Sequence, residues 1–176
     1  MKRWTAAMIV GAVAALVSVS PARAQYIFAG GGANIPVSDF KDTHKTGWIV
    51  QGGVGVDIGD KGLWVEAEGW YGSNKAKSSC TTCDKVDLWS ALGALGYSFS
   101  PDKNVSPYIL GGAGVLGIKD GETTFGYTGA LGVGFKVGSG AQIFLEGRWL
   151  AGTGDNKDAK MIPLTVGISY NFSKKM

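Results

Sequence analysis

The chain has 176 residues, of which 45% are hydrophobic, 18% are charged and 29 are glycine. This apolar, weakly charged composition excludes an intrinsically disordered protein, and the five prolines without a glycine triplet period exclude collagen. The formal charge of +3 arises from Lys2, Arg3 and Arg23, since the remaining 14 basic residues balance the 14 acidic ones. Without a basic surface, a nucleic-acid partner is excluded as well.

The first 24 residues have the pattern of an export signal. Lys2 and Arg3 precede an uncharged stretch over residues 6–19 that is apolar except for one serine, and Ala22-Arg23-Ala24 follows. We expect a secretory signal peptide over residues 1–24, used in Sec-type export and cleaved before Gln25. The alternative is a membrane anchor, but an apolar run of about 14 residues is shorter than the ~20 that a spanning helix needs.

The rest of the chain alternates between bulky and small or polar residues with a period of two, which is typical of β-strands. Residues 125–137 show this best, because Phe125, Leu131 and Phe135 share one face with Val137. Scattered glycine disfavours helices, and glycine on both faces leaves the phase of the first and fifth segments ambiguous. The sequence predicts eight strands, at residues 26–35, 46–58, 62–72, 85–99, 105–118, 123–137, 141–151 and 160–172.

The connections between these segments alternate in length. Residues 59–62, 100–104 and 138–140 form tight turns, whereas residues 34–45, 73–84 and 152–159 form longer polar loops. The remaining connection, residues 119–122, is short. Tight turns at one end and longer loops at the other predict an even-numbered, up-and-down meander.

The two faces of the strands predict the surroundings of the sheet. The face opposite the bulky residues is small or polar, as a narrow lumen requires, and the bulky face ends in aromatic residues at both rims. These aromatic residues are Trp48 and Phe125 at one rim, and Tyr97, Phe99, Phe135, Tyr170 and Phe172 at the other. We therefore expect an all-β fold, an eight-stranded antiparallel up-and-down transmembrane β-barrel over residues 25–172, with a short tail at 173–176. The alternative is a soluble, lipocalin-like carrier, which would bury the bulky face.

Two segments resemble small bacterial outer-membrane barrels of the OmpA transmembrane domain, OmpX and opacity-protein kind. Residues 165–172 match that family's assembly signal, in which Thr165 and Gly167 precede Tyr170 and Phe172, and residues 107–115 match its glycine-rich strand. The resemblance implies a porin-like or surface-antigen protein of the Gram-negative outer membrane, with the barrel assembly machinery as a partner. The family usually ends on the aromatic residue, whereas residues 173–176 follow it here.

Charged residues on the inward face form a predicted lumen cluster. Glu66 and Glu68 on the third strand face Glu146 and Arg148 on the seventh, so that Arg148 is expected to pair with Glu66 or Glu68. Asp57 and Lys136 share this face.

These charges predict a static polar plug, whereas the resemblance to OmpA-like proteins implies a gate that opens a narrow channel. Paired carboxylates could also act as general acid and base, but a lumen filled by side chains would leave no room for a substrate.

Cys80 and Cys83 lie in the second long loop. Exported cysteines meet an oxidising compartment, so a disulfide is expected, with free thiols as the alternative. A zinc site would need two more ligands, and His44 is the one histidine in the sequence. We therefore expect no metal and no cofactor.

Some eight-stranded outer-membrane barrels are enzymes that use a histidine to modify lipid A. His44 is therefore the candidate catalytic residue to consider. Those deacylases carry a His-x-Ser pair that is missing here, and Ser38, Asp39 and Asp42 are too loosely spaced from His44 to indicate a triad. We expect a solvated loop histidine, no catalytic residue and no enzyme.

Lysines are frequent in the outward loops. Their ammonium groups could hold the phosphates of lipopolysaccharide, although aspartates are interspersed and ordinary solvated charge is an equal alternative. These residues are Lys41, Lys45, Lys75, Lys77, Lys157 and Lys160.

The resulting functional hypothesis is a structural or surface-interaction protein, adhesin-like or antigen-like. Its partners would be outer-membrane lipid, lipopolysaccharide, or a host or cell-surface ligand. The gated channel and the lipid A-modifying enzyme are its alternatives.

Overall fold

The computed structural model describes residues 25–59, 61–119, 121–154 and 159–172. The predicted signal peptide and the tail at 173–176 lie outside the described residues, as does Lys157. Within the described part of the chain, no helix is long and apolar enough to cross a membrane.

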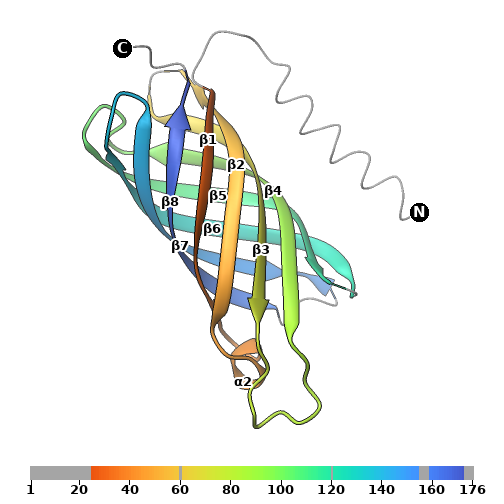
Figure 1. Ribbon diagram of the computed structural model, residues 1–176. Helices are drawn as coiled ribbons and strands as arrows, with labels where there is room; N and C mark the ends of the chain where they lie inside the picture. Colours follow the sequence, from red (N-terminus) through yellow and green to blue (C-terminus); the bar gives the residue numbers. More distant parts are fainter. Residues whose placement is uncertain (1–24, 60, 120, 155–158, 173–176) are drawn as a thin grey trace.

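Eight antiparallel strands close into a barrel in which each strand pairs with its sequence neighbours and β1 pairs with β8 (Figure 1). Each predicted strand matches an observed one to within two residues, so the predicted fold class is confirmed. The strands are β1 (Gln25–Pro36), β2 (Gly47–Ile58), β3 (Leu63–Asn74), β4 (Val86–Ser98), β5 (Val105–Ile118), β6 (Thr123–Lys136), β7 (Ala141–Gly152) and β8 (Lys160–Asn171).

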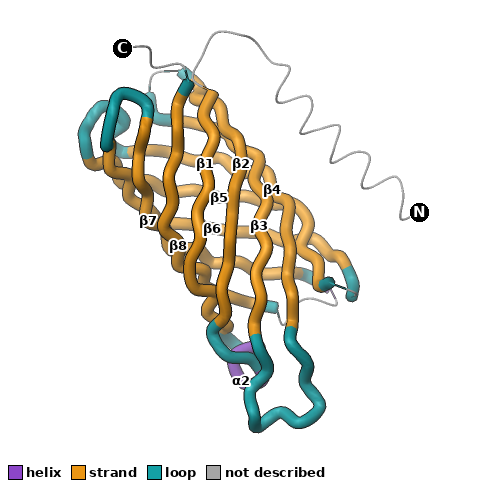
Figure 2. Tube along the Cα trace, viewed as in Figure 1, coloured by secondary structure: helices purple, strands orange, loops and turns teal. Residues whose placement is uncertain are grey.

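The two ends of the barrel differ. The tight turns and the end of β8 lie at one end, which we call the turn end (Figure 1). The longer connections lie at the other, the loop end, where Figure 2 shows the short helix α2 (Phe40–Thr43) beside the second long loop. Asn74 holds the loop end of β3 by donating hydrogen bonds to the carbonyl oxygens of Asn34, at 3.0 Å, and Lys45, at 2.9 Å.

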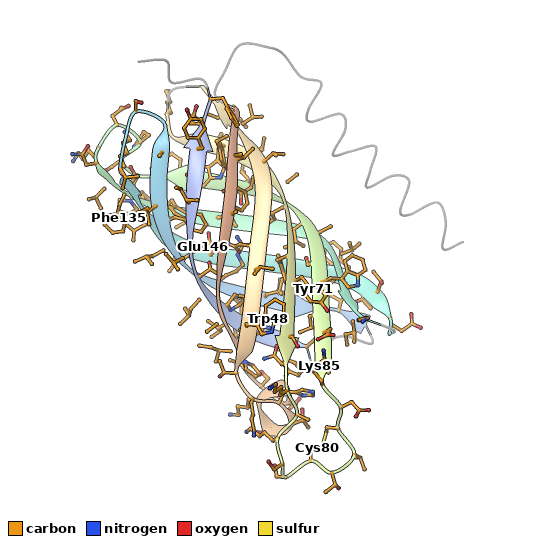
Figure 3. The ribbon with its side chains drawn as sticks, in the orientation of Figure 1. Trp48, Tyr71, Cys80, Lys85, Phe135 and Glu146 are labelled. Atoms are coloured by element: carbon orange, nitrogen blue, oxygen red, sulfur yellow. A yellow bond between two sulfur atoms is a disulfide. The ribbon has the colours of Figure 1, made fainter. Side chains whose placement is uncertain are left out.

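The outer surface of the barrel is apolar. Leu131 exposes 69% of its surface, and the outward side chains of β8, including Val166 and Ile168, are exposed too. Trp48 and Phe135 lie toward opposite ends of the strands (Figure 3). A soluble barrel would bury these side chains, so the outward apolar face fits acyl chains rather than water.

The inward face departs from the prediction at the loop end. The expectation that small and polar residues line this whole face is wrong there, because large apolar side chains fill the lumen. Eight strands leave an interior just wide enough for side chains to occupy, and aliphatic side chains fill it without needing hydrogen-bond partners. This apolar layer consists of Phe40, Ile49, Trp70, Leu88, Leu92, Leu116, Leu150, Ala159 and Met161.

Toward the turn end, inward aromatic rings lie against glycines of the neighbouring strand. Trp64 is directly opposite Gly96 in the register, and a Cβ atom built on Gly96 would overlap the indole ring. The same pairing joins Tyr26 to Gly55 and Tyr108 to Gly132, with Phe28 opposite Gly53 and Phe144 opposite Gly167. The missing side chains of these glycines make room for the rings inside a narrow lumen.

Replacing Gly96 with alanine tests this packing. Gly96→Ala is expected to lower the free energy of unfolding by about 1–3 kcal/mol, because the new methyl group displaces the Trp64 ring. Gly93→Ala on the same strand is the matched control, since a Cβ atom there meets nothing within 4 Å. Urea titration of both variants in lipid vesicles measures the difference. Equal losses would show that the ring contact does not set the cost.

Candidate functional site in the barrel lumen

Four charged residues meet in the middle of the lumen. Glu66 and Glu68 on β3 and Glu146 and Arg148 on β7 all point inward, because side chains two residues apart share a face of a strand. All four are buried, and Arg148 exposes only 3% of its surface. The sequence therefore predicted their common orientation correctly.

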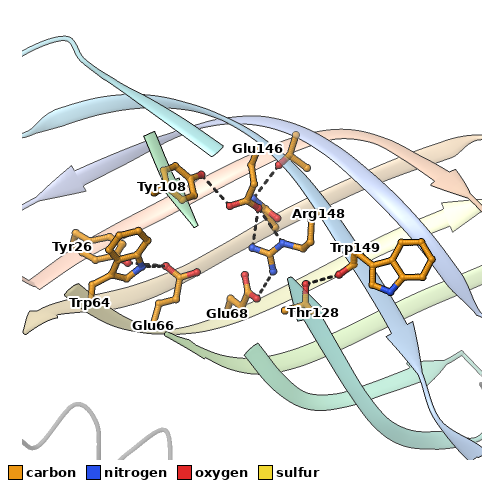
Figure 4. A network of polar contacts seen from close by, with 11 residues as sticks. Tyr26, Trp64, Glu66, Glu68, Tyr108, Thr128, Glu146, Arg148 and Trp149 are labelled. Atoms are coloured by element: carbon orange, nitrogen blue, oxygen red, sulfur yellow. Dashed lines mark hydrogen bonds and ion pairs between the residues drawn. The ribbon is translucent and has the colours of Figure 1, made fainter. Parts of the chain in front are cut away.

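Arg148 holds two of the three carboxylates. Its Nε and Nη2 atoms donate hydrogen bonds to Oε1 of Glu146, at 3.0 and 2.8 Å, and its Nη1 atom forms an ion pair with Oε1 of Glu68 (Figure 4). A buried charge is costly unless a partner compensates it, and here one guanidinium compensates two carboxylates, Glu146 on its own strand and Glu68 across the lumen on β3. Of the two partners expected across the lumen, Arg148 pairs with Glu68.

Glu66 instead receives hydrogen bonds from neutral donors. Tyr26 donates its hydroxyl to Oε2 of Glu66 at 2.7 Å, and the indole Nε1 of Trp64 donates to the same oxygen at 3.1 Å (Figure 4). Tyr108 donates in the same way to Oε2 of Glu146, at 3.0 Å. Glu68 and Glu146 thus share one guanidinium, whereas aromatic donors satisfy Glu66 and add one hydrogen bond to Glu146.

The sequence reasoning missed Tyr26, Trp64 and Tyr108. Tyr26 and Tyr108 lie on β1 and β5, where glycine on both faces hides the phase of the alternation. Trp64 could have been found, because it is two residues before Glu66 and therefore shares its face.

The other two predicted members of the charge cluster lie nearer the turn end. Asp57 is level with Trp64 in the register of β2 and β3, and Lys136 is level with Gln142 at the start of β7. Both line a cavity of about 540 Å³ that also borders Glu66 and Arg148. The expectation that side chains fill the lumen and leave no room for a small molecule is therefore wrong at the turn end.

The second long loop contains a disulfide between Cys80 and Cys83. In the described part of the chain, no group of three or more histidine, cysteine or acidic side chains is placed to hold a metal ion.

His44 corrects the prediction of a solvated loop histidine. It is 8% exposed, and its ring lies 4.6 Å from that of Phe40 between centroids. Thr43 Oγ1 lies 2.8 Å from Nδ1, and the carbonyl oxygen of Asp84 lies 3.1 Å from Nε2. His44 is buried because it joins the first and second long loops, and these contacts do not involve Ser38, Asp39 or Asp42.

The loop lysines that the structure describes differ in exposure. Lys41, Lys45 and Lys75 are exposed, whereas Lys77 and Lys160 are half-buried. Lys85, which was not among the predicted lysines, forms an ion pair of 2.9 Å with Asp87, and the hydrogen bond to Asp87 raises the pKa of Lys85 above its ordinary value. Among the predicted lysines that the structure describes, Lys41, Lys45 and Lys75 are therefore the ones best placed to meet a charged surface.

The predicted assembly signal divides between the two faces of β8. Thr165 points inward and accepts a hydrogen bond from Nε2 of Gln51 at 3.2 Å, and Gly167 makes room for the ring of Phe144. Tyr170 and Phe172 point outward with their ring centroids 5.2 Å apart. The two aromatic residues thus lie on the lipid side of the last strand.

Comparisons with known proteins agree with this architecture. A family model described as outer membrane protein beta-barrel domain matches residues 5–172. The chain is similar to the crystal structure of Neisserial surface protein A, with 18% identity and a TM-score of 0.69, over 84% of this chain and 97% of that one. It is also similar to the N-terminal β-barrel domain of Pseudomonas aeruginosa OprF, with 13% identity and a TM-score of 0.54, over 87% of this chain and all of that one. No curated protein sequence matches the chain.

Removing the guanidinium tests its role in the lumen. Arg148→Met is expected to lower the free energy of unfolding by about 3–5 kcal/mol, because Glu68 and Glu146 lose their cation while buried. Adding Glu68→Gln should recover part of this loss.

Lys85→Met is the matched control, since it removes an ion pair whose ammonium group is exposed to solvent and should change the free energy of unfolding less. Urea unfolding in vesicles, followed by tryptophan fluorescence, compares the two. Similar losses in both variants would contradict a special role for the buried network.

Proposed function

Since the chain belongs to the outer-membrane protein β-barrel family, we propose that it is a surface protein of the bacterial outer membrane with a structural or surface-interaction role. Export with cleavage before Gln25 is part of this proposal. The observation that carries it is the apolar layer at the loop end, which fills the lumen where a channel would need an aqueous path. An adhesin-like or antigen-like role then falls to the loops, the part of such a barrel that faces outside.

The two largest loops support this role because they are packed together. The backbone of Lys45 donates a hydrogen bond to the carbonyl oxygen of Lys75 at 2.9 Å, and that of Lys77 donates to Thr43 at 2.8 Å. His44 adds its contact with Asp84, and the disulfide constrains the second loop. A braced loop pair presents a defined surface to a partner and loses less entropy on binding than two free loops do.

A gated channel is the second candidate, and the ion pair between Arg148 and Glu68 is the observation in its favour. Exchange of partners at Arg148 would open only the middle of the lumen, however, because Trp70, Leu92 and Leu150 still fill the loop end. An apolar constriction of this kind excludes ions without any gate.

Planar-bilayer recording separates these two functions. The purified wild-type barrel is expected to give no stepwise ion conductance, and Arg148→Ala is expected to give none either, because the apolar layer remains. A porin inserted in the same way confirms that the assay detects open channels. Steps that appear in the wild type, or that appear in Arg148→Ala alone, would favour the channel.

We further propose that the exposed loop lysines bind the phosphates of lipopolysaccharide. Lipopolysaccharide in the bilayer is expected to raise the unfolding temperature of the wild type, and the triple substitution of Lys41, Lys45 and Lys75 by glutamine should lose most of this increase. The electrophoretic mobility shift of the heated barrel measures unfolding.

Glutamine at Lys61 and Lys103 provides the control, because these exposed lysines lie in the turns. The increase should survive in this control and disappear at high salt. An increase that the triple variant keeps would exclude the lysines as the lipopolysaccharide site.

A further inference from the structure

The turn end of the lumen contains a cavity that the proposed surface role does not use. Its volume is about 540 Å³, within the range of small-molecule sites. Residues of all three tight turns line its mouth, among them Gly59, Pro101 and Ser139. Arg148 and Gln51 lie at its floor, and the apolar layer follows beyond them. The cavity is therefore open at the turn end and closed toward the loops.

Aromatic rings form much of the cavity wall. Tyr26, Trp64 and Tyr108 line it together with Phe28 and Phe144. Each ring lies against a glycine of the adjacent strand, and each also lines the cavity. The Trp64 and Tyr108 rings meet edge to face, with centroids 5.6 Å apart. Aromatic faces carry negative charge density and attract cations that lose their water.

The charges at the cavity also favour a cation. Four carboxyl groups line it, against two basic side chains, Arg148 and Lys136. Arg148 is already paired with Glu68 and Glu146. Both hydrogen bonds that Glu66 receives from Tyr26 and Trp64 end on Oε2, and neither ends on Oε1. The four carboxyl groups belong to Asp57, Glu66, Asp102 and Glu146.

We propose that this cavity binds a small organic ammonium ion with a compact apolar body, such as an arylalkylamine. The ammonium group donates a hydrogen bond to Oε1 of Glu66 and lies against the ring of Trp64, while the apolar body contacts Phe28 and Phe144. A carboxylate beside aromatic faces is the chemistry that selects such cations over anions and neutral molecules of the same shape.

The closed floor determines how the ligand enters. The turn end faces the periplasm in outer-membrane barrels, so the ammonium ion enters and leaves on that side. Because the apolar layer blocks the loop end, the cavity binds its ligand without passing it across the membrane.

Fluorine NMR with 4-fluorobenzylamine as the probe tests the proposal in the wild-type barrel in lipid nanodiscs. The neutral isostere 4-fluorobenzyl alcohol is the matched ligand, because it has nearly the same shape and no charge. The ammonium probe is expected to bind saturably and roughly tenfold more tightly than the alcohol. Equal affinities, or line broadening that empty nanodiscs reproduce, would overturn the proposal.

Two variants locate the binding site. Glu66→Gln keeps an oxygen for Tyr26 and Trp64 but removes the charge, and it should weaken binding of the amine roughly tenfold while leaving the alcohol unaffected. Glu122→Gln makes the same change in the exposed connection at the loop end and should leave the affinity unchanged.

Unchanged binding in Glu66→Gln, or an equal loss in Glu122→Gln, would contradict a site at the turn end. If Glu66→Gln does not show the electrophoretic shift of a folded barrel, the comparison of amine with alcohol on the wild type decides. Neither outcome depends on the loops, so failure here leaves the proposed surface role untouched.

Discussion

The pairing of β1 with β8 is the contact on which the other features of the barrel depend. In a hydrocarbon layer an unpaired N–H or C=O group costs several kcal/mol, and a sheet avoids this cost by leaving no edge. Closure with eight strands then sets the width of the lumen, and the period of two sends every second side chain into it. That width also explains the glycines opposite the inward rings. A residue with a side chain at position 96, for example, would overlap the Trp64 ring directly across from it.

Within the narrow lumen, the kind of hydrogen-bond partner that Glu66 and Glu68 have depends on how far each lies from the open turn end. Glu66 borders the open cavity, and neutral donors from Tyr26 and Trp64 satisfy one of its oxygens. Glu68 lies one inward position closer to the loops, next to the apolar layer, and it pairs directly with Arg148. This order is physically reasonable, because the cost of burying a charge rises as water is excluded and only a cation offsets it there.

The sequence predicted the inward and outward residues best on those strands whose two faces differ strongly in size and polarity. The alternation around Leu131 fixed the phase of β6, and Glu146 with Arg148 fixed that of β7, so the lumen network was partly visible beforehand. The prediction failed on β1 and β5. Glycine lies on both faces of these strands, so the alternation does not show which residues point inward, and Tyr26 and Tyr108 were overlooked. The prediction of a solvated His44 failed for another reason. Its burial depends on a contact between two loops, in which Asp84 lies 40 residues further along the chain, and strand periodicity does not predict such a contact.

The three levels of the lumen give the two ends of the barrel different tasks. Apolar side chains such as Leu150 exclude water at the loop end, Arg148 cross-links β7 to β3 below them, and the aromatic cavity opens at the turns. The compensated charges of the middle level therefore separate the apolar side chains of the loop end from the open cavity. The loops can then vary with an external partner without disturbing the cavity, and the cavity can bind a small molecule without disturbing the loops.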